Sequence, residues 1–235
     1  MTTYVLVHGA WGGSWSWDYV AEELRAQGHD VRTPTLTGMA DRSHLLTPDV
    51  NLSTHIADVA RLIEWDDLTD VVLAGHSYGG MVVAGVCGHI PERISQAVYI
   101  DAFVPDPGQS CIDILPWLDE VYTGLASASG GLYMDPLDPE GVGVVDPASL
   151  ALIRERSTPM PIACVREPLP GPDRPREGLP ITYVNCTKLG LFADTAGAGR
   201  ERGWKVVDLD SDHFPSITHP AAVAKELLEG LRLRS

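Results

Sequence analysis

The sequence predicts an α/β fold in which a mostly parallel sheet carries helices on both faces. Two observations lead to this prediction. Short runs rich in Val and Ile alternate with stretches whose apolar residues recur at helical spacing, as in repeated strand–helix–strand units. In addition, the apolar run at residues 71–74 passes through a Gly-rich turn directly into a helical pattern. With 235 residues and 44% hydrophobic content, the chain can build one substantial core.

Six strands and four long helices are expected in that core. The strands are predicted at residues 4–7, 29–34, 70–74, 96–100, 179–185 and 204–209. The helices are predicted at residues 15–27, 52–64, 79–89 and 220–233. Asn51 or Ser53 is expected to cap the second helix, and Pro220 suits the first turn of the last one.

Residues 103–178 interrupt the alternation of strands and helices because they are dense in Pro and Gly. A stretch of this length is too long for a simple loop in a compact domain. Short helical patterns occur within it at residues 111–122 and 148–156. We therefore predict a core made of residues 1–102 and 179–235, and a helical lid, residues 103–178, inserted before the penultimate strand.

The acidic balance of the chain limits its partners. The 32 Asp and Glu residues outnumber the 17 Lys and Arg residues, which gives a formal net charge of −15. Nucleic acids and anionic membrane surfaces attract basic proteins, so neither is expected to bind this chain. We expect a small, neutral or apolar molecule as the substrate, and the sequence leaves a homodimer open.

The cysteines and the start of the chain point to a cytoplasmic setting. Neither a secretory leader nor an apolar run of membrane-spanning length is visible. The four cysteines are far apart and lack metal-binding or Cys-x-x-Cys spacing. We expect them to be buried thiols in a reducing compartment, and we expect no metal site. These residues are Cys87, Cys111, Cys164 and Cys186.

Ser77 is the candidate nucleophile. It stands in Gly75-His76-Ser77-Tyr78-Gly79, between an apolar strand pattern and a helical one. A serine on such a tight strand-to-helix turn needs small neighbours and a strained backbone, and its hydroxyl then lies exposed at the start of a helix. The Tyr78 backbone N–H at the same helix start can face negative charge that develops on a substrate oxygen.

A serine hydroxyl needs a base, and His213 is the best candidate among the eight histidines. It follows the last predicted strand and precedes the last predicted helix, which places it at the same edge of the sheet as Ser77. The other histidines are assigned no catalytic role. His8, His29 and His76 are expected to be structural, and the remaining four are expected at the surface or as caps: His44, His55, His89 and His219.

The base needs a carboxylate that fixes its tautomer. Asp101 directly follows the strand predicted at residues 96–100, and chemistry in open α/β sheets gathers at such carboxyl ends. After the strand predicted at residues 179–185, no carboxylate occurs before Asp194. We assign Asp101 as the acid and keep Asp194 as the alternative.

The turn after the first strand is expected to complete an oxyanion hole. It reads His8-Gly9-Ala10-Trp11-Gly12-Gly13, and its small residues allow the backbone to approach a substrate. The Ala10 N–H is assigned as the donor that joins the Tyr78 N–H, with the Trp11 N–H as the alternative. The turn lacks the glycine fingerprints of nucleotide-binding loops. Apolar side chains are expected to line the substrate pocket: Trp11, Phe103, Trp117, Leu118, Tyr122, Leu125 and Tyr133.

These motifs resemble the α/β-hydrolase superfamily over nearly the whole chain, and in particular the plant methylesterase and hydroxynitrile lyase branch with its bacterial esterase relatives. The resemblance is carried by segments 5–11, 28–31, 75–81 and 212–213, together with Trp15 and Trp17. It implies a Ser–His–acid esterase that uses no metal and no organic cofactor, with a pocket roofed by the lid.

The chain departs from that branch at three places. The plant proteins carry an acidic pair after the strand that follows the lid, where this chain has Lys188-Leu189. The cyanohydrin-cleaving members carry Thr and Lys where this chain has Gly9 and Phe214, so the resemblance does not extend to cyanohydrin cleavage. The lid sequence matches the plant proteins poorly, so their substrates are not carried over.

The leading hypothesis is a serine hydrolase that cleaves a carboxylic ester or lactone of a small, largely apolar or neutral molecule through an acyl-enzyme. An alternative is a lyase, cyclase or isomerase that uses the same Ser77–His213 pair for proton transfer. A small-molecule receptor on the same fold is a third hypothesis. It is disfavoured because a receptor has no use for a strained serine turn.

Overall fold

A computed structural model describes residues 1–171 and 178–232 of the chain. Its centre is a six-stranded parallel sheet in the order β2-β1-β3-β4-β7-β8. All six predicted strands are present, with boundaries that differ by a few residues, and the predicted α/β class is confirmed. The strands are β1 (Thr3–Val7), β2 (Asp30–Arg32), β3 (Val71–His76), β4 (Ile94–Ile100), β7 (Ile181–Cys186) and β8 (Lys205–Leu209).

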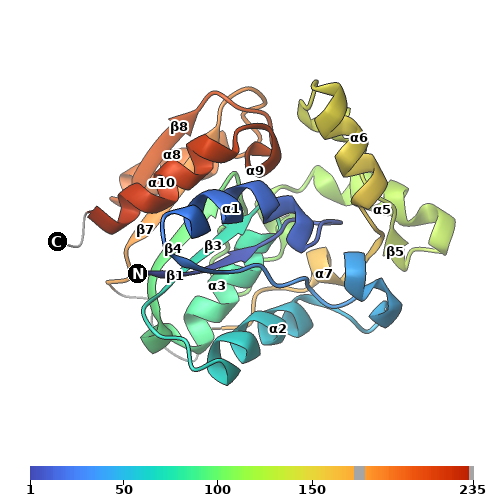
Figure 1. Cartoon of the computed structure of the whole chain (residues 1–235). Helices are drawn as coiled ribbons and strands as arrows, with labels where there is room; N and C mark the ends of the chain where they lie inside the picture. The colour runs from blue at the N-terminus through green and yellow to red at the C-terminus, as the bar shows by residue number, and fades with distance from the viewer. Residues whose placement is uncertain (172–177, 233–235) are drawn as a thin grey trace.

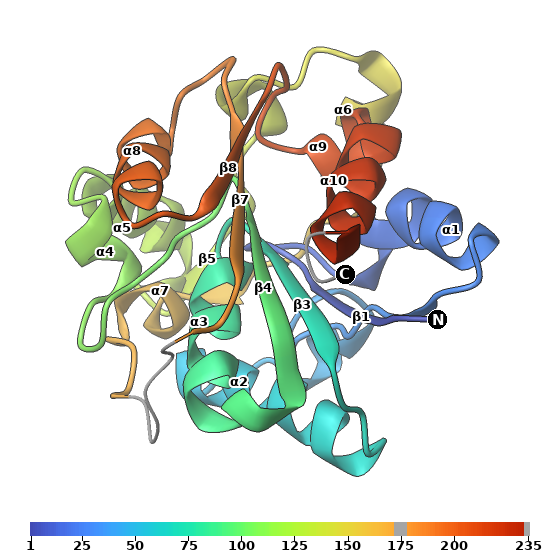
Figure 2. The same cartoon turned by 90° about the vertical axis from the view of Figure 1, so that its left-hand side faces the viewer.

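Helices cover both faces of the sheet (Figures 1 and 2). Alternate residues of each strand point to opposite faces, and both sets are apolar, so two hydrophobic layers form. One layer packs against α1 (Asp18–Ala26) and α10 (Pro220–Arg232). The other packs against α2 (Leu52–Trp65), α3 (Gly79–His89) and α8 (Ala193–Glu201). The short helix α9 (Pro215–Thr218) precedes α10.

The long core helices begin and end close to their predicted limits. The helix predicted at residues 15–27 starts as a 3-10 turn, Ser14–Trp17, before α1 begins. Asn51 caps α2, because its side chain accepts a hydrogen bond from the Thr54 N–H at 3.0 Å. Ser53, the other predicted cap, lies inside α2. Residue 233, the predicted end of the last helix, lies outside the described residues.

The segment predicted as a lid carries short elements that lie on the right of Figure 1. Its residues 172–177 lie outside the described residues. The helix predicted at residues 111–122 is broken after Ile114, because Leu115 precedes Pro116 and adopts a non-helical backbone with φ −128°. The described elements are α4 (Cys111–Ile114), α5 (Leu118–Ala126), a 3-10 turn at Ser127–Ser129, β5 (Tyr133–Met134), a 3-10 turn at Pro139–Val142, α6 (Pro147–Arg156), β6 (Met160–Pro161) and α7 (Ala163–Arg166).

Strands β5 and β6 pair antiparallel and were not predicted. Each has two residues, which is too short for a periodic pattern to show. Among residues 1–171 and 178–232, no helix combines the length and the apolar character needed to cross a membrane.

The start of α3 packs directly on the chain that leaves β4. A Cβ atom added at Gly80 would lie 2.1 Å from the backbone oxygen of Phe103, and the Phe103 N–H donates to the Ser77 carbonyl at 3.2 Å. A backbone oxygen held in this way cannot move aside as the end of a flexible side chain could. Only glycine therefore fits at position 80.

Gly80→Ala is expected to destabilise the fold by about 3 kcal/mol, because the added methyl group overpacks this contact. Urea unfolding measures the loss. Gly197→Ala in α8 is the matched control, since beyond the adjoining backbone of α8 no described residue comes within 4 Å of the added Cβ. That variant is expected to gain about 0.5–1 kcal/mol from helix propensity. Equal stability of the two variants would contradict a rigid contact at Gly80.

Candidate active site

Ser77 occupies the sharp turn between β3 and α3. Its φ is +52°, in the left-handed region that side chains other than glycine rarely adopt. A Cβ atom added at Gly75 would lie 2.6 Å from the Gly79 oxygen, and one added at Gly79 would lie 2.7 Å from the backbone oxygens of Val7 and His8. The two glycines therefore let the turn pass between its neighbours, and Ser77 directly precedes Tyr78, the N-cap of α3.

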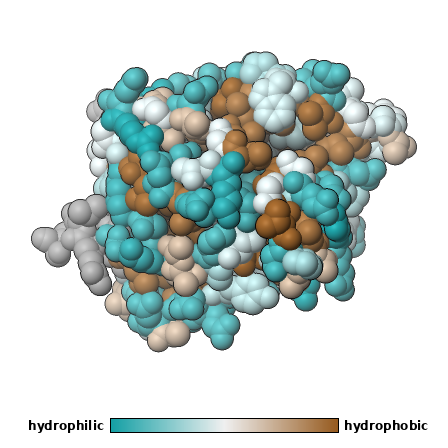
Figure 3. All heavy atoms as spheres, turned by 90° about the horizontal axis from the view of Figure 1, so that it is seen from above, coloured by the Kyte–Doolittle hydropathy of each residue, from teal (hydrophilic) through white to brown (hydrophobic). Residues whose placement is uncertain are grey.

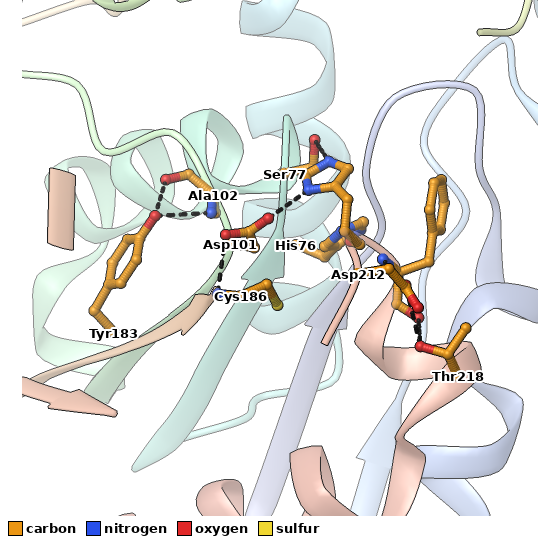
Figure 4. A network of polar contacts seen from close by, with 10 residues as sticks. His76, Ser77, Asp101, Ala102, Tyr183, Cys186, Asp212 and Thr218 are labelled. Atoms are coloured by element: carbon orange, nitrogen blue, oxygen red, sulfur yellow. Dashed lines mark hydrogen bonds and ion pairs between the residues drawn. The ribbon is translucent and has the colours of Figure 1, made fainter. Parts of the chain in front are cut away.

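The structure brings Ser77, His213 and Asp101 together in one chain of contacts, of which Figure 4 labels Ser77 and Asp101. His213 Nε2 lies 3.0 Å from Ser77 Oγ, and His213 Nδ1 lies 2.6 Å from Asp101 Oδ2. Both His213 and Asp101 are buried. A carboxylate only accepts, so the Nδ1–H donates to Asp101, and Nε2 is left to accept the hydroxyl proton of Ser77.

Asp101 is held at the carboxyl end of β4 by the neighbouring strand β7. Its N–H donates to the Val184 carbonyl at 2.8 Å, and its Oδ1 accepts from the Cys186 N–H at 3.1 Å. The alternative acid, Asp194, lies exposed in the first turn of α8. Asp101 is thus the carboxylate that bonds to His213.

The turn after β1 lies against Ser77. A Cβ atom added at Gly9 would lie 3.1 Å from the Cβ of Ser77, so the two turns are in close contact. Ala10 and Trp11 line the same cavity as Ser77 and His213, and Trp11 has a φ of +60°.

The turn after β1 is also tied to the segment predicted as a lid. The Trp11 indole N–H donates to the Met134 carbonyl at 3.1 Å, and the Trp11 carbonyl accepts from the Thr158 N–H at 3.0 Å. The Thr158 hydroxyl in turn accepts from the Ala40 N–H at 2.8 Å. These bonds join Met134 of β5 and Thr158, which precedes β6, to the turn beside Ser77.

A largely apolar cavity of about 280 Å³ opens beside Ser77 and His213. The four residues assigned to substrate contact all line it: Trp11, Phe103, Trp117 and Tyr122. Leu118 lines it as well. Leu125 and Tyr133, also expected there, do not: Leu125 packs against the core and Tyr133 pairs with Pro161 in the small sheet.

Sequence reasoning missed part of the cavity wall. Leu189, Leu191 and Phe192 follow β7, and Phe214 follows His213. These residues could have been predicted to line the cavity, because they follow strands of the sheet at the edge where Ser77 lies. Trp117 and Leu189 are 56% and 45% exposed, so apolar side chains reach from the cavity to the surface. On the face seen in Figure 3, apolar side chains gather in several groups between hydrophilic ones.

His55 corrects a prediction, because it is buried instead of lying at the surface or capping a helix. Its Nε2 donates to the Thr37 carbonyl at 2.9 Å, so its Nδ1 accepts from the Tyr78 hydroxyl at 2.9 Å. The signal was available, since His55 shares the apolar stripe of α2 with Leu52 and Ile56. His55 thereby anchors the side chain next to Ser77.

Two further buried histidines surround the site and are structural, as predicted. His76 Nε2 donates to the His213 carbonyl, and burial together with the neighbouring His213 holds the pKa of His76 well below its usual value. His8 Nδ1 donates to the Gly9 carbonyl, and its Nε2 accepts from the Leu36 N–H at 3.0 Å. Burial lowers the pKa of His8 to about 4.

Acid is expected to destabilise the protein through His8. The unfolded chain binds a proton at His8 below its ordinary pKa near 6.5, whereas the folded chain binds it only near pH 4. Stability is therefore lost as the pH falls from 6.5 to 4, and His8 alone accounts for about 2 kcal/mol at pH 5. Urea unfolding at pH 7.5 and pH 5 measures the loss. The His8→Gln variant, which keeps an acceptor but does not titrate, should lose less; an equal loss would exclude His8 as a source.

Among the described residues, no group of three or more His, Cys, Asp or Glu side chains could hold a metal ion. Cys111, Cys164 and Cys186 are buried, and they form no disulfide bond with one another.

Comparisons with known proteins agree with this geometry. A family model described as the alpha/beta hydrolase family matches residues 4–226. The chain is 52% identical over 116 residues to the carbendazim hydrolyzing esterase of Nocardioides sp. (strain SG-4G). The matched region covers 49% of this chain and 48% of that protein. It is 31% identical over 143 residues to Methylesterase 1 of Arabidopsis thaliana, and this match covers 56% of this chain and 54% of that protein. The chain thus matches about half the length of these curated relatives.

Among solved structures, the chain is similar to an extracellular alpha/beta-hydrolase from a Paenibacillus species. The TM-score is 0.85 and the sequence identity is 27%. The superposition covers 98% of this chain and 99% of the other, so the likeness extends over sheet, helices and intervening segments.

Proposed function

Because the chain belongs to the alpha/beta hydrolase family, we propose that it is a serine hydrolase that cleaves a carboxylic ester or lactone of a small, neutral, largely apolar molecule. One observation carries this proposal: Ser77 Oγ, His213 and Asp101 form a continuous hydrogen-bonded chain that ends at an apolar cavity. Such a chain activates a serine for attack on a carbonyl carbon.

In the proposed reaction, Ser77 Oγ attacks the carbonyl carbon while His213 Nε2 takes the hydroxyl proton. Asp101 stabilises the resulting imidazolium. The Tyr78 and Ala10 N–H groups hold the oxyanion of the tetrahedral intermediate. His213 then gives the proton to the leaving alkoxide, and an acyl-enzyme remains. Water attacks the acyl-enzyme with His213 as base, which releases the acid and restores Ser77.

The substrate is proposed to lie in the cavity, between the core and a lid formed by residues 103–178. The proposed contacts are Trp11 from the core and Phe103, Trp117 and Tyr122 from the lid, all of which line the cavity. The residues that line it include no Asp, Glu, Lys or Arg, which supports an uncharged substrate. Since one relative is named for hydrolysing carbendazim, that compound is a substrate to test first, together with methyl esters.

Covalent labelling tests the proposal. A fluorophosphonate should add one equivalent to the protein, and peptide mapping should place the adduct on Ser77. A series of p-nitrophenyl esters of rising acyl length should be hydrolysed, with activity falling once the acyl group outgrows the 280 Å³ cavity. No adduct and no turnover of any ester would refute the proposal. Turnover of a substrate without an acyl-enzyme would favour proton-transfer chemistry instead.

Tyr122→Phe is expected to change specificity without a general loss of activity. The Tyr122 side chain is buried and lines the cavity, and no residue in the described part of the chain forms a hydrogen bond with its hydroxyl. That hydroxyl is free to bind a polar atom of the substrate. For a p-nitrophenyl ester with one ether oxygen in its acyl chain, kcat/KM should fall about tenfold, as expected for one lost hydrogen bond. The hydrocarbon ester of equal length is the control, and an equal loss for both would contradict this role.

The charge of the chain and its cysteines support the expected kind of partner and the expected compartment. A net charge of −15 supports a small-molecule partner over nucleic acid or an anionic membrane surface. The buried thiols of Cys111, Cys164 and Cys186, which form no disulfide bond with one another, support a reducing, cytoplasmic setting.

A further inference from the structure

The Tyr183 hydroxyl forms hydrogen bonds with both backbone polar groups of Ala102, the residue that follows Asp101. It donates to the Ala102 carbonyl at 2.9 Å and accepts from the Ala102 N–H at 3.1 Å (Figure 4). Tyr183 lies on β7, and its side chain is completely buried. Burial, and next the charge of Asp101, raise the pKa of Tyr183 well above its usual value, so the hydroxyl keeps the proton that it donates. One oxygen atom of Tyr183 thus holds the N–H and the carbonyl of Ala102 in place.

Asp101 needs such support because it leaves the sheet in a strained conformation. Strand β4 ends at Ile100, and Asp101 has a φ of +43°, in the left-handed region where a residue with a side chain is strained. Its N–H still pairs with Val184 of β7, but Ala102 has moved beyond the regular ladder. The Tyr183 hydroxyl supplies at Ala102 the hydrogen bonds that a neighbouring strand would otherwise supply.

The same strand also orients the carboxylate of Asp101. The Cys186 N–H donates to Oδ1, which leaves Oδ2 directed at His213 Nδ1. The Cys186 N–H and the His213 Nδ1–H thus orient the carboxylate, one at each oxygen. The position of the carboxylate depends on the Asp101–Ala102 backbone, which bonds to the Val184 carbonyl and to the Tyr183 hydroxyl. A shift of the Asp101–Ala102 backbone would carry Oδ2 away from His213.

We propose that Tyr183 is a positioning residue for Asp101: its hydroxyl, by holding the Ala102 peptide, keeps the carboxylate aligned with His213 for the reaction. This inference rests on the proposed function. Tyr183 does not line the cavity beside Ser77, and its hydroxyl reaches the site through the backbone that follows Asp101.

A double-mutant cycle in the full-length protein tests the proposal. Tyr183→Phe, which removes one oxygen atom, should lower kcat for a p-nitrophenyl ester by about 10- to 100-fold at little change in KM, since a misplaced catalytic group costs rate more than binding. In an Asp101→Asn background, the same substitution should lower kcat less than twofold, because the group that it positions is already lost. The acid limb of the kcat–pH profile should also shift in Tyr183→Phe, because His213 faces a displaced carboxylate.

Tyr4→Phe is the matched control. Tyr4 on β1 is equally buried, and its hydroxyl donates to the Leu227 carbonyl at 3.4 Å, away from the site. This variant loses the same atom and should keep the kcat and the pH profile of the unsubstituted protein. If Tyr183→Phe does not fold, 3,5-difluorotyrosine at position 183 keeps the ring and the hydroxyl but makes the oxygen a weaker acceptor for the Ala102 N–H. It should give a smaller loss of kcat in the same direction.

The outcomes separate this inference from the proposed function. An unsubstituted protein that hydrolyses no ester and takes up no fluorophosphonate refutes the proposed function itself. An active protein that loses kcat in Asp101→Asn but keeps it in Tyr183→Phe refutes only the role of Tyr183. Equal losses from Tyr183→Phe in both backgrounds would also refute it, because they would show a general structural effect.

Discussion

Replacing Ser77 with Ala is expected to lower kcat for ester hydrolysis by about 10⁶-fold, because the proposed nucleophile is removed while the rest of the site is kept. Ser77 Oγ lies 3.0 Å from His213 Nε2, and no other hydroxyl in the described part of the chain forms a hydrogen bond with that nitrogen. Fluorophosphonate labelling should disappear together with turnover. Active-site titration and initial rates on a p-nitrophenyl ester measure both effects.

Two comparisons make this result specific. Ser43→Ala, in the exposed 3-10 turn Ala40–Leu45, should retain full activity and labelling. The double variant Ser77→Ala/His213→Ala should be no worse than Ser77→Ala, because the two residues act as one unit. Substantial turnover by Ser77→Ala would show that the serine is not the nucleophile, and a proton-transfer reaction would then be the better hypothesis.

Asp101→Asn is expected to lower kcat by about 10⁴-fold with little change in KM. The Asn amide can present an N–H to His213 Nδ1, which favours the tautomer with the proton on Nε2. That tautomer cannot accept the proton of Ser77. The loss should shrink at high pH if hydroxide assists attack, so rates should be measured from pH 6 to pH 10.

Asp194→Asn is the control for this prediction, since it makes the same change in the alternative acid. Asp194 lies exposed on α8, and its substitution should leave kcat unchanged. The reverse pattern, with loss in Asp194→Asn and retention in Asp101→Asn, would exchange the two assignments. Equal loss in both would point to a rearranged loop between β7 and α8.

The core of the fold was predictable because its signals are local and repeated. Strand β3 opens with a continuous apolar run, β7 is rich in β-branched and aromatic residues, and the helix predicted at residues 79–89 is α3 with both limits correct. The lid was harder, since two-residue strands carry no period and Pro116 divides a helical pattern. Its small sheet depends on contacts between residues far apart in the chain, which no local pattern reveals.

For the candidate site, chain order was the informative signal. Ser77, Asp101 and His213 each follow a strand of a parallel sheet, so their meeting at one edge follows from topology. The partners that hold them were not predictable in this way. Tyr183 and His55 act through single atoms of buried side chains, and their sequence context resembles that of ordinary core residues.

The hydrogen bonds between the turn after β1 and the lid limit how this protein can be recombined with its relatives. Trp11 donates to Met134 and accepts from Thr158, so the proposed oxyanion turn and the roof of the cavity are parts of one unit. A chimera that imports a foreign lid alone would separate these partners and disturb the turn beside Ser77. Exchange of pockets between family members should therefore succeed more often when the two segments are inherited together.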